Sequence, residues 1–273
     1  GTPLKDWDIK INYGIKTGFN DAFIIDGKKK DELIAQDPKS AEIIKKFIRG
    51  RDINNTKFNY NEYFLINSHN GIKDKEIPRI DVLNDYPAIF NHLKQFEKEL
   101  ISRQDKGDHW TNLRNCAYLE EFEKDKIAFP VINRKWSFIF VEKGIQVLAP
   151  MRFITANSKN ELFYIKSIFG GNLIKWYWKR VGNMQDNNGF QMDSYIVEMI
   201  PIPKIPLEEQ QPFIDLVDII LKKKEKGEDT TIEEQTIDML VYKLYELTDE
   251  EVKVVEPGFA LSKEEYENYE LEG

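Results

Sequence analysis

Four clusters of Asn, Gln, Lys and Arg side chains are the strongest chemical signal in the sequence. Asn and Gln can hydrogen-bond the edge of adenine bidentately, and Arg and Lys can do the same for guanine, so these side chains on rigid turns suit the reading of DNA bases. The clusters are Lys16, Thr17 and Asn20; Arg49 and Arg51; Asn133, Arg134, Lys135 and Trp136; and Asn183, Gln185, Asn187, Asn188 and Gln191. Taken singly, each cluster is better explained as an ordinary turn or a helix cap. Their concentration in expected interstrand loops favours binding.

The residue types that act in catalysis do not form a recognisable catalytic or metal-binding motif in this sequence. The three histidines, His69, His92 and His109, lack metal-ligand spacing and are expected on the surface or in loops. The chain has no Gly-x-Ser-x-Gly, no Walker-type loop, no dinucleotide fingerprint and no convincing metal-dependent nuclease motif. It also has no Pro-Pro, which excludes the Asn/Asp-Pro-Pro-Tyr/Phe motif of amino-methyltransferases. None of the 47 carboxylates lies in an apolar context that would shift its pKa. We therefore expect no catalytic residue, metal site or cofactor in this chain.

The net charge of −8 is unevenly distributed. Residues 1–206 hold 32 Lys and Arg against 27 Asp and Glu, a net of +5, whereas residues 207–273 hold 7 against 20, a net of −13. Within residues 126–182 there are 10 basic residues against 2 acidic ones. Such a segment can attract a polyanion locally, although a solvated basic face explains the same counts.

Cysteine usage and hydropathy indicate the cellular compartment in which the chain is expected. Cys116 is the only cysteine, so no internal disulfide can form, and the cell interior is the expected location. No apolar run approaches the ~20 residues that a membrane span needs, and no signal peptide is present. The chain begins at Gly1 without an initiator methionine, which suggests a piece of a larger protein. We expect a cytoplasmic location.

The elements that position these clusters can be read from apolar periodicity. Residues 7–26 predict a hairpin, and Asp37-Pro38 predicts the start of a helix with Ile43, Ile44, Phe47 and Ile48 on its apolar face. Further strands are expected at 63–66, 126–131, 136–141, 145–149 and 190–202. Their connections are short, which favours antiparallel pairing.

Helices are expected to flank the sheet. Pro87 opens one helix, and Ser158 with Glu161 forms a capping box for another that is broken at Gly170-Gly171. Two apolar-faced helices joined near Gly227 predict a C-terminal helical hairpin. The residues beyond Pro257 are acidic and are expected to form a loose tail.

Seven segments carry a resemblance to a known family. In order, they are GIKTGFNDAFIID (14–26), EIIKKFIRGRDI (42–53), YPAIFNHL (86–93), RQDKG with NLR (103–114), KIAFPVI (126–132), SYIVEMIPIPKIPLEEQQPFI (194–214) and IDMLVYKLYELTDEEVKVVE (237–256). The chain resembles the TaqI-like C-terminal specificity domain of adenine-specific DNA methyltransferases and type IIG restriction-modification enzymes. The Gly-x-x-Thr-Gly-x-Asn and Arg-Gly-Arg-Asp-Ile blocks are the most specific parts, because periodicity explains neither.

The resemblance implies a covalently linked methyltransferase domain that binds S-adenosylmethionine, and in some members a nuclease domain that could use Mg²⁺. It also implies double-stranded DNA as the partner, with the target adenine flipped toward the methyltransferase. The family's motifs match this sequence best at seven residues, to which the resemblance assigns family roles most directly: Lys16, Thr17, Gly18, Asn20, Arg49, Arg51 and Asp52. Blocks that the whole family shares cannot by themselves read a site that differs between members. Base contacts are therefore expected from the loops near residues 133–136 and 183–191.

The sequence as a whole predicts an α+β fold, with a twisted, mainly antiparallel sheet flanked by helices and a C-terminal helix hairpin. Residues 1–206 are expected to form the DNA target-recognition domain, 207–256 a helical hairpin packed on it, and 257–273 the acidic tail. Two alternatives stay open. One is a divergent metal-dependent nuclease whose carboxylates converge only in the fold, and the other is a protein-interaction module like a specificity subunit.

Overall fold

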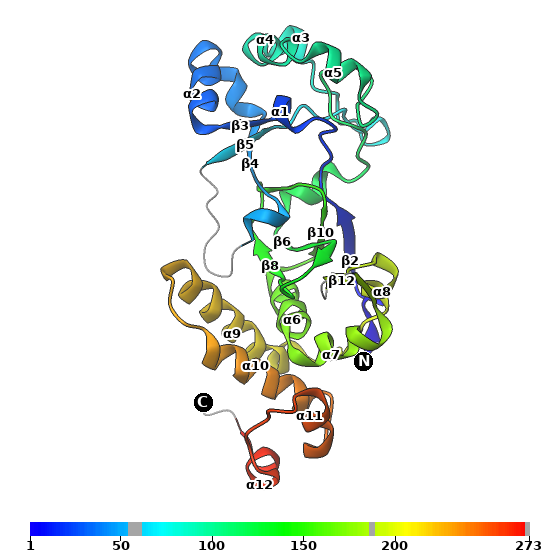
Figure 1. Cartoon of the computed structure of the whole chain (residues 1–273), viewed down its shortest axis with the longest axis vertical. Helices are drawn as coiled ribbons and strands as arrows, with labels where there is room; N and C mark the ends of the chain where they lie inside the picture. The colour runs from blue at the N-terminus through cyan, green and yellow to red at the C-terminus, as the bar shows by residue number, and fades with distance from the viewer. Residues whose placement is uncertain (54–61, 186–188, 271–273) are drawn as a thin grey trace. The chain divides into compact units, whose positions relative to one another are not determined.

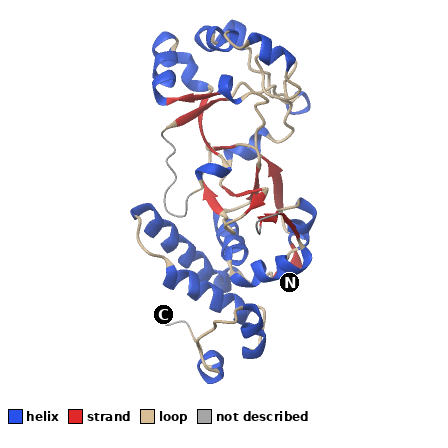
Figure 2. Ribbon diagram, in the orientation of Figure 1, coloured by secondary structure: helices blue, strands red, loops and turns tan. Residues whose placement is uncertain are grey.

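The computed structural model describes residues 1–53, 62–185 and 189–270, and its chain divides into two compact units. Unit 1 comprises residues 1–9, 131–139 and 156–273, and unit 2 comprises residues 10–130 and 140–155. Both units contain helices and strands (Figure 1, Figure 2). The predicted α+β class is confirmed, with the strands divided among several sheets. The predicted boundaries at residues 206 and 256 stay a prediction.

Unit 2 contains two four-stranded sheets. One has the order β2-β10-β6-β8, formed by β2 (Ile9–Tyr13), β10 (Met151–Ala156), β6 (Lys126–Pro130) and β8 (Ile139–Val141). The other has the order β3-β5-β4-β9, formed by β3 (Ile24–Asp26), β5 (Tyr63–Ile66), β4 (Ile44–Ile48) and β9 (Gln146–Val147). Antiparallel pairing joins β10 to β6, β3 to β5 and β5 to β4, whereas β4 and β9 are parallel.

Short helices flank the second sheet of unit 2. They are α1 (Asn20–Phe23), α2 (Gly27–Gln36), α3 (Val82–Asp85), α4 (Pro87–Lys94) and α5 (Glu97–Ser102), with 3₁₀ turns at Pro38–Glu42, Gly50–Asp52, Lys73–Lys75 and Leu119–Glu123. Leu65 and Ile66 of β5 join Ile89 and Leu93 of α4 in one core in which all four are fully buried. This core holds the chain segments that surround the Gly14–Asn20 turn.

Unit 1 is mainly helical. Its helices are α6 (Lys159–Gly170), α7 (Asn172–Val181), α8 (Ser194–Met199), α9 (Leu207–Lys226), α10 (Thr231–Leu244), α11 (Asp249–Val255) and α12 (Lys263–Glu267), with a 3₁₀ turn at Leu4–Asp6. A two-stranded sheet joins β1 (Thr2–Pro3) to β13 (Pro201–Ile202). A three-stranded antiparallel sheet has the order β11-β12-β7, from β11 (Asn183–Gln185), β12 (Gly189–Gln191) and β7 (Ile132–Asn133).

Several helix signals in the sequence are confirmed. The Ser158 side chain caps α6 by accepting a hydrogen bond from the Glu161 backbone N–H. The helical segment is interrupted at Gly170-Gly171, where α6 ends and α7 begins. The C-terminal hairpin consists of α9 and α10, which lie side by side (Figure 1). Its first helix ends at Gly227, whose φ of +76° is the left-handed cap that glycine favours. The tail is not loose within the described residues, because α12 buries Tyr266 to 2% exposure.

Three predicted elements are wrong. Residues 7–26 form no hairpin, because β2 and β3 belong to different sheets. The helix predicted after Pro38 is only a 3₁₀ turn followed by strand β4. The central strand β4 is paired on both sides, so apolar residues on both of its faces imitate a helical stripe. The strand predicted over 190–202 ends at Gln191 and gives way to helix α8.

Candidate nucleic-acid interface

The three-stranded sheet of unit 1 brings two remote polar segments together. Asn183 pairs with Gln191 across β11 and β12, and Phe190 pairs with Asn133 across β12 and β7. Because side chains alternate along a strand, Asn183, Gln185 and Gln191 share one face of this sheet. We call these three residues the amide face.

A chain of hydrogen bonds connects the amide face to two residues beyond β12. Gln185 Nε2 donates to Gln191 Oε1, and Gln191 Nε2 donates to Asp193 Oδ1 at 2.9 Å. Asn183 Nδ2 donates to Asp193 Oδ2 at 2.8 Å and to the Tyr195 hydroxyl at 3.1 Å. Asn183, Gln185 and Tyr195 are exposed, so this polar network lies at the surface, where a ligand can reach it.

The loop after β7 divides into buried and exposed residues. Asn133 is fully buried and brackets a turn, accepting from the Ser137 N–H at 2.8 Å and donating to the Ser137 carbonyl at 3.0 Å. Trp136 is 7% exposed and packs on Phe190, with ring centroids 4.8 Å apart. Arg134 and Lys135 between them are exposed. The structure therefore gives Asn133 and Trp136 a supporting role and presents the two cations to solvent.

In unit 2 the Gly-x-x-Thr-Gly-x-Asn block forms a tight turn. A Cβ on Gly14 would lie 2.5 Å from the backbone of Leu148, and Gly18 has φ of +69°, so both positions require glycine. Thr17, which is buried, donates from its hydroxyl to Asn20 Oδ1 at 2.6 Å. The block thus has a structural explanation for each of its defining residues, and it leaves Asn20 exposed and Lys16 half-buried.

Arg103, only 7% exposed, holds this turn from a distant part of the chain. Its guanidinium donates to the carbonyls of Thr17, Trp110 and Asn112 and lies 4.5 Å from the centroid of the Phe23 ring. Burial lowers the pKa of Arg103 to about 10, which still leaves it charged at neutral pH. A buried cation bonded to three backbone carbonyls fixes the turn more firmly than exposed side chains could.

A cavity of about 290 Å³ gathers the candidates of unit 2. Lys16, Thr17, Asn20 and Arg49 all line it. The Arg49 guanidinium lies over the rings of Phe47 and Tyr63, at 5.6 and 5.0 Å from their centroids. Arg51 is exposed and does not line this cavity. Lys16 and Arg49, which the sequence separates by more than thirty positions, are therefore neighbours in one polar hollow.

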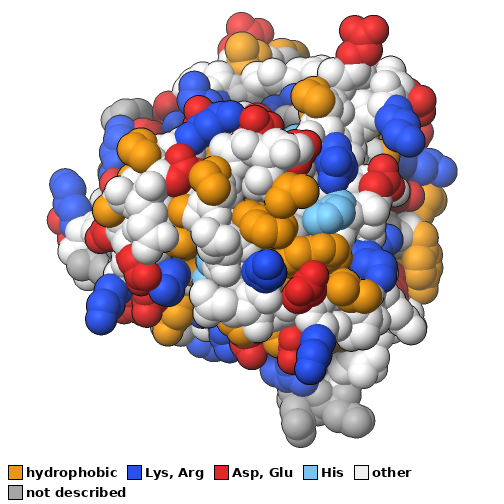
Figure 3. Space-filling view, turned by 90° about the horizontal axis from the view of Figure 1, so that it is seen from above, with side chains coloured by type: hydrophobic (Ala, Val, Ile, Leu, Met, Phe, Trp, Pro, Cys, Tyr) orange, Lys and Arg blue, Asp and Glu red, His pale blue; other side chains and the backbone are white. Residues whose placement is uncertain are grey.

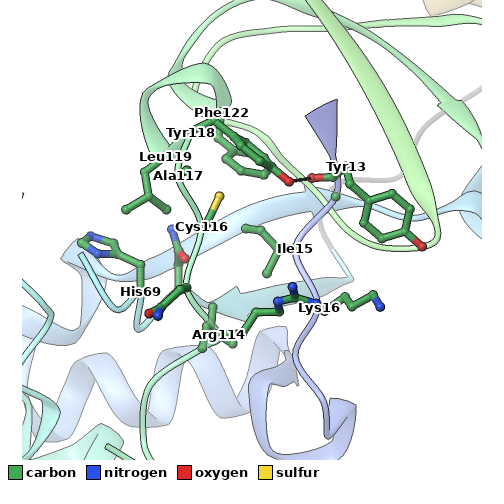
Figure 4. A pocket seen from close by; sticks show the side chains of 14 residues that line it. Tyr13, Ile15, Lys16, His69, Arg114, Cys116, Ala117, Tyr118, Leu119 and Phe122 are labelled. Atoms are coloured by element: carbon green, nitrogen blue, oxygen red, sulfur yellow. Dashed lines mark hydrogen bonds between the residues drawn. The ribbon is translucent and has the colours of Figure 1, made fainter. Parts of the chain in front are cut away.

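A second cavity of unit 2, of about 400 Å³, shares Ile15 and Lys16 with the first. In Figure 4 the side chains of Tyr13 and Lys16 point away from Cys116 and His69, and the Tyr118 hydroxyl donates to the Tyr13 carbonyl at 3.0 Å. Burial raises the pKa of the Cys116 thiol and lowers that of His69. These shifts favour the neutral thiol and imidazole, so Lys16 and Arg114 are the charged residues of this lining.

The structure separates the predicted site residues into two groups. Lys16, Thr17, Asn20, Arg49 and Arg51 belong to unit 2, whereas the candidates from Asn133 to Trp136 and from Asn183 to Gln191 belong to unit 1. Asn187, Asn188 and the side chain of Asp52 lie outside the described residues. The amide network also includes Asp193 and Tyr195, which the sequence analysis missed. Arg103 supports the turn, although the sequence singled it out only as part of a family motif.

Two expectations about titratable residues are wrong. His92 is 7% exposed and within hydrogen-bond distance of the Ala22 carbonyl, so it is a core residue of α4. Glu121 is fully buried: burial alone would raise its pKa, but hydrogen bonds from Lys10, Thr155 and Lys124 lower it to about 2. The pKa of Asp238 is shifted in the opposite direction, because burial raises it to about 7. Carboxylates whose pKa is strongly shifted are thus present.

The described residues contain no group of three or more His, Cys, Asp or Glu that could hold a metal ion. Within the same residues, no helix is both long and apolar enough to cross a bilayer. The face of the molecule in Figure 3 mixes basic and acidic side chains around a group of hydrophobic ones. Among the described residues on that face, positive and negative side chains are therefore interspersed.

Comparison with known proteins places these features in a family. No curated protein matches the sequence. Among solved structures, the type IIL restriction-modification enzyme MmeI in complex with DNA is similar, with a TM-score of 0.66, 12% identity and coverage of 89% of this chain and 33% of that one. The type IIG restriction endonuclease BpuSI is similar at a TM-score of 0.48 and 12% identity, over 88% of this chain and 31% of that one. The chain thus spans about a third of both enzymes. A family model, the TaqI-like C-terminal specificity domain, matches residues 45–202, and the chain belongs to that family.

Proposed function

We propose that this chain recognises a specific sequence in double-stranded DNA, as the target-recognition part of a restriction-modification enzyme. Membership of the specificity-domain family and the fold shared with MmeI, whose structure contains DNA, support the proposal. The observation that carries it is the amide face: three Asn and Gln side chains of two paired strands lie on one side of a small sheet. Amides on a rigid strand pair suit the reading of base edges.

The two units suit different kinds of DNA contact. In unit 2, Lys16 lies on the Gly14–Asn20 turn, Arg49 lines the same cavity, and Arg51 is exposed in the 3₁₀ turn that follows Arg49. Cations placed in this way suit phosphate contacts that position the duplex. Arg134 and Lys135 of unit 1 are exposed cations at the end of β7, whose partner strand β12 carries Gln191. They would hold phosphates beside the bases that the amide face reads.

The catalytic steps belong, in this proposal, to other parts of the parent protein. A linked methyltransferase domain would bind S-adenosylmethionine and modify an adenine, and a nuclease domain, where present, would use Mg²⁺. This chain would contribute recognition without a catalytic residue of its own. Assays of methyl transfer and of Mg²⁺-dependent cleavage, run with the chain alone and with the full-length parent, test this division.

Selection from a randomised duplex library tests recognition itself. The 273-residue chain is expected to enrich a defined sequence at low salt, and sequencing of the bound fraction reads it out. The paired variant Arg134→Ala/Lys135→Ala is expected to weaken binding to all sequences alike. It should also make the slope of log affinity against log salt shallower by about 0.9 for each phosphate that the variant no longer neutralises.

Lys222→Ala is the matched control, since Lys222 is an exposed lysine on α9 of the same unit. It should leave both affinity and salt slope unchanged. A library that comes through selection with no enriched sequence at any salt concentration would contradict sequence-specific recognition.

A further inference from the structure

Asp193 is placed to cap a helix and does not do so. It occupies the N-cap position of α8, where an Asp side chain ordinarily accepts from a backbone N–H of the first turn, but no such bond is present. Its two carboxylate oxygens accept instead from Gln191 Nε2 and Asn183 Nδ2. The side chain forgoes a local bond for two bonds to the amide face.

A carboxylate fixes which way its amide partners face. It only accepts hydrogen bonds, so both Asn183 and Gln191 must turn their NH₂ groups toward Asp193. Gln191 Oε1 then faces Gln185 and requires the NH₂ group of Gln185 opposite it, as the structure has it. Amide orientation is normally ambiguous, but here each link determines the next.

The orientation of these amides determines which hydrogen-bonding groups remain available to a ligand. Both hydrogens of Asn183 Nδ2 are engaged, by Asp193 and Tyr195, so Asn183 offers only its Oδ1 acceptor. Gln185 uses one hydrogen of Nε2 for its bond to Gln191 and offers its Oε1 together with the second hydrogen. Gln185 therefore keeps one acceptor and one donor for a ligand, whereas Asn183 keeps an acceptor alone.

In the major groove, adenine shows an N6 amino donor beside the N7 acceptor, which matches the Oε1 and Nε2–H of Gln185. Guanine shows two acceptors, N7 and O6, and would face Gln185 Oε1 with no donor. We infer that Gln185 reads an adenine, that Asn183 accepts from the exocyclic amino group of a second base, adenine or cytosine, and that Asp193 sets this preference by orienting both amides. The inference rests on the proposed function.

Library selection with single variants tests it. Wild type is expected to enrich adenine at one position, and Gln185→Ala to reduce the preference for adenine there by about tenfold, the equivalent of roughly 1.4 kcal/mol. Asp193→Asn replaces one of the two accepting oxygens with an NH₂ donor, so the residue can no longer accept from both amides. Preference should therefore fall at the Gln185 position, at the Asn183 position or at both. Affinity for a duplex that lacks the enriched sequence should stay unchanged, which a merely unfolded variant would not show.

A matched control exists on α9, where Gln211 Nε2 donates to Asp215 Oδ1 at 2.7 Å on an exposed surface of the same unit. Asp215→Asn makes the same carboxylate-to-amide change in a similar pair and is expected to leave the selected sequence intact. Asp193→Glu, which keeps a carboxylate, should recover part of the preference that Asp193→Asn loses.

The outcomes distinguish failure of the proposed function from failure of the inference. If wild type enriches no sequence, the proposed function fails and takes the inference with it. If wild type enriches a sequence whose preferences neither Gln185→Ala nor Asp193→Asn alters, recognition stands and the inference is overturned. The inference would also be overturned if Gln185→Ala reduced a preference for guanine and left the preference for adenine unchanged.

Discussion

The turn of unit 2 and the amide face of unit 1 are both polar, but they are held in place differently. In the turn, a buried guanidinium bonds to backbone carbonyls, and two glycines are required by the path of the backbone. On the amide face, exposed and half-buried side chains bond to one another. We therefore expect the turn to tolerate little change without loss of the fold, and the amide face to tolerate more. In the proposed function, the first region would maintain the scaffold and the second would read the target.

Arg103 is the position where this contrast should be greatest. Arg103→Met would leave the carbonyls of Thr17, Trp110 and Asn112 without their donor, and bonds to a charged donor contribute about 1.5–3 kcal/mol each. We expect a loss of roughly 3 kcal/mol or more in the free energy of unfolding, measured by urea denaturation. Hydrogen exchange should show the loss in peptides of unit 2.

Arg114→Met is the control for that change. Arg114 is about half exposed and pairs with Asp105 at 3.0 Å, and surface pairs of this kind contribute less than about 1 kcal/mol. Equal losses for the two variants would show that the buried guanidinium does not fix the turn.

The two units should also respond to pH in opposite directions. The pKa of Glu121 in unit 2 is lowered to about 2, so its contribution to stability is present above about pH 4.5 and is lost as the pH falls toward 2. The pKa of Asp238 in unit 1 is raised to about 7, so the stability that goes with its protonated form is present below about pH 4 and is lost as the pH rises through 7.

Hydrogen exchange at several pH values can follow each unit separately. Glu121→Gln is expected to weaken the acid dependence of unit 2, by an amount on the order of 2–3 kcal/mol, and to leave unit 1 unchanged. Asp238→Asn is expected to remove the loss of stability of unit 1 between about pH 5 and 8. Parallel pH profiles in the two units would contradict the assignment of each carboxylate.

The smallest effect is expected on the amide face. The triple variant Asn183→Ala/Gln185→Ala/Gln191→Ala removes its polar network, but surface substitutions usually change stability by no more than about 0.5 kcal/mol. In urea denaturation, the triple variant should therefore have nearly the same free energy of unfolding as wild type, even though its selected DNA sequence is expected to change. A loss above about 2 kcal/mol would mean that the three-stranded sheet depends on this network for its fold.

Much of the fold could be predicted because its signals are local. Ser158 before α6, the glycine pair after it and Gly227 between α9 and α10 act within a few residues of their own positions. Strand β4 could not be recognised, because what distinguishes it from a helix is pairing with β5 and β9, and β9 follows it by about a hundred residues. The error lies where tertiary pairing overrides local pattern.

The residue types of the candidate site could be predicted from the sequence, but the role of each residue could be predicted less well. Arg134, Asn183 and Gln185 stood out as exposed polar residues on turns, and the structure exposes them. The role of Arg103 was not visible, because it acts on Thr17 across 86 positions of the sequence. Asp193 stands where a helix cap is expected, and only the placement of Asn183 and Gln191 shows its side chain serving another purpose.

The chain path has a consequence for engineering. Unit 1 takes strand β7 from residues 131–139, a segment flanked on both sides by residues of unit 2. If the amide face reads DNA as proposed, a new specificity could not be transplanted from a relative as the 183–195 segment alone, since the strand that pairs with β12 would stay behind. An exchange that begins before residue 131 and ends after residue 195 carries the whole small sheet, but it also replaces strands β8, β9 and β10 of unit 2.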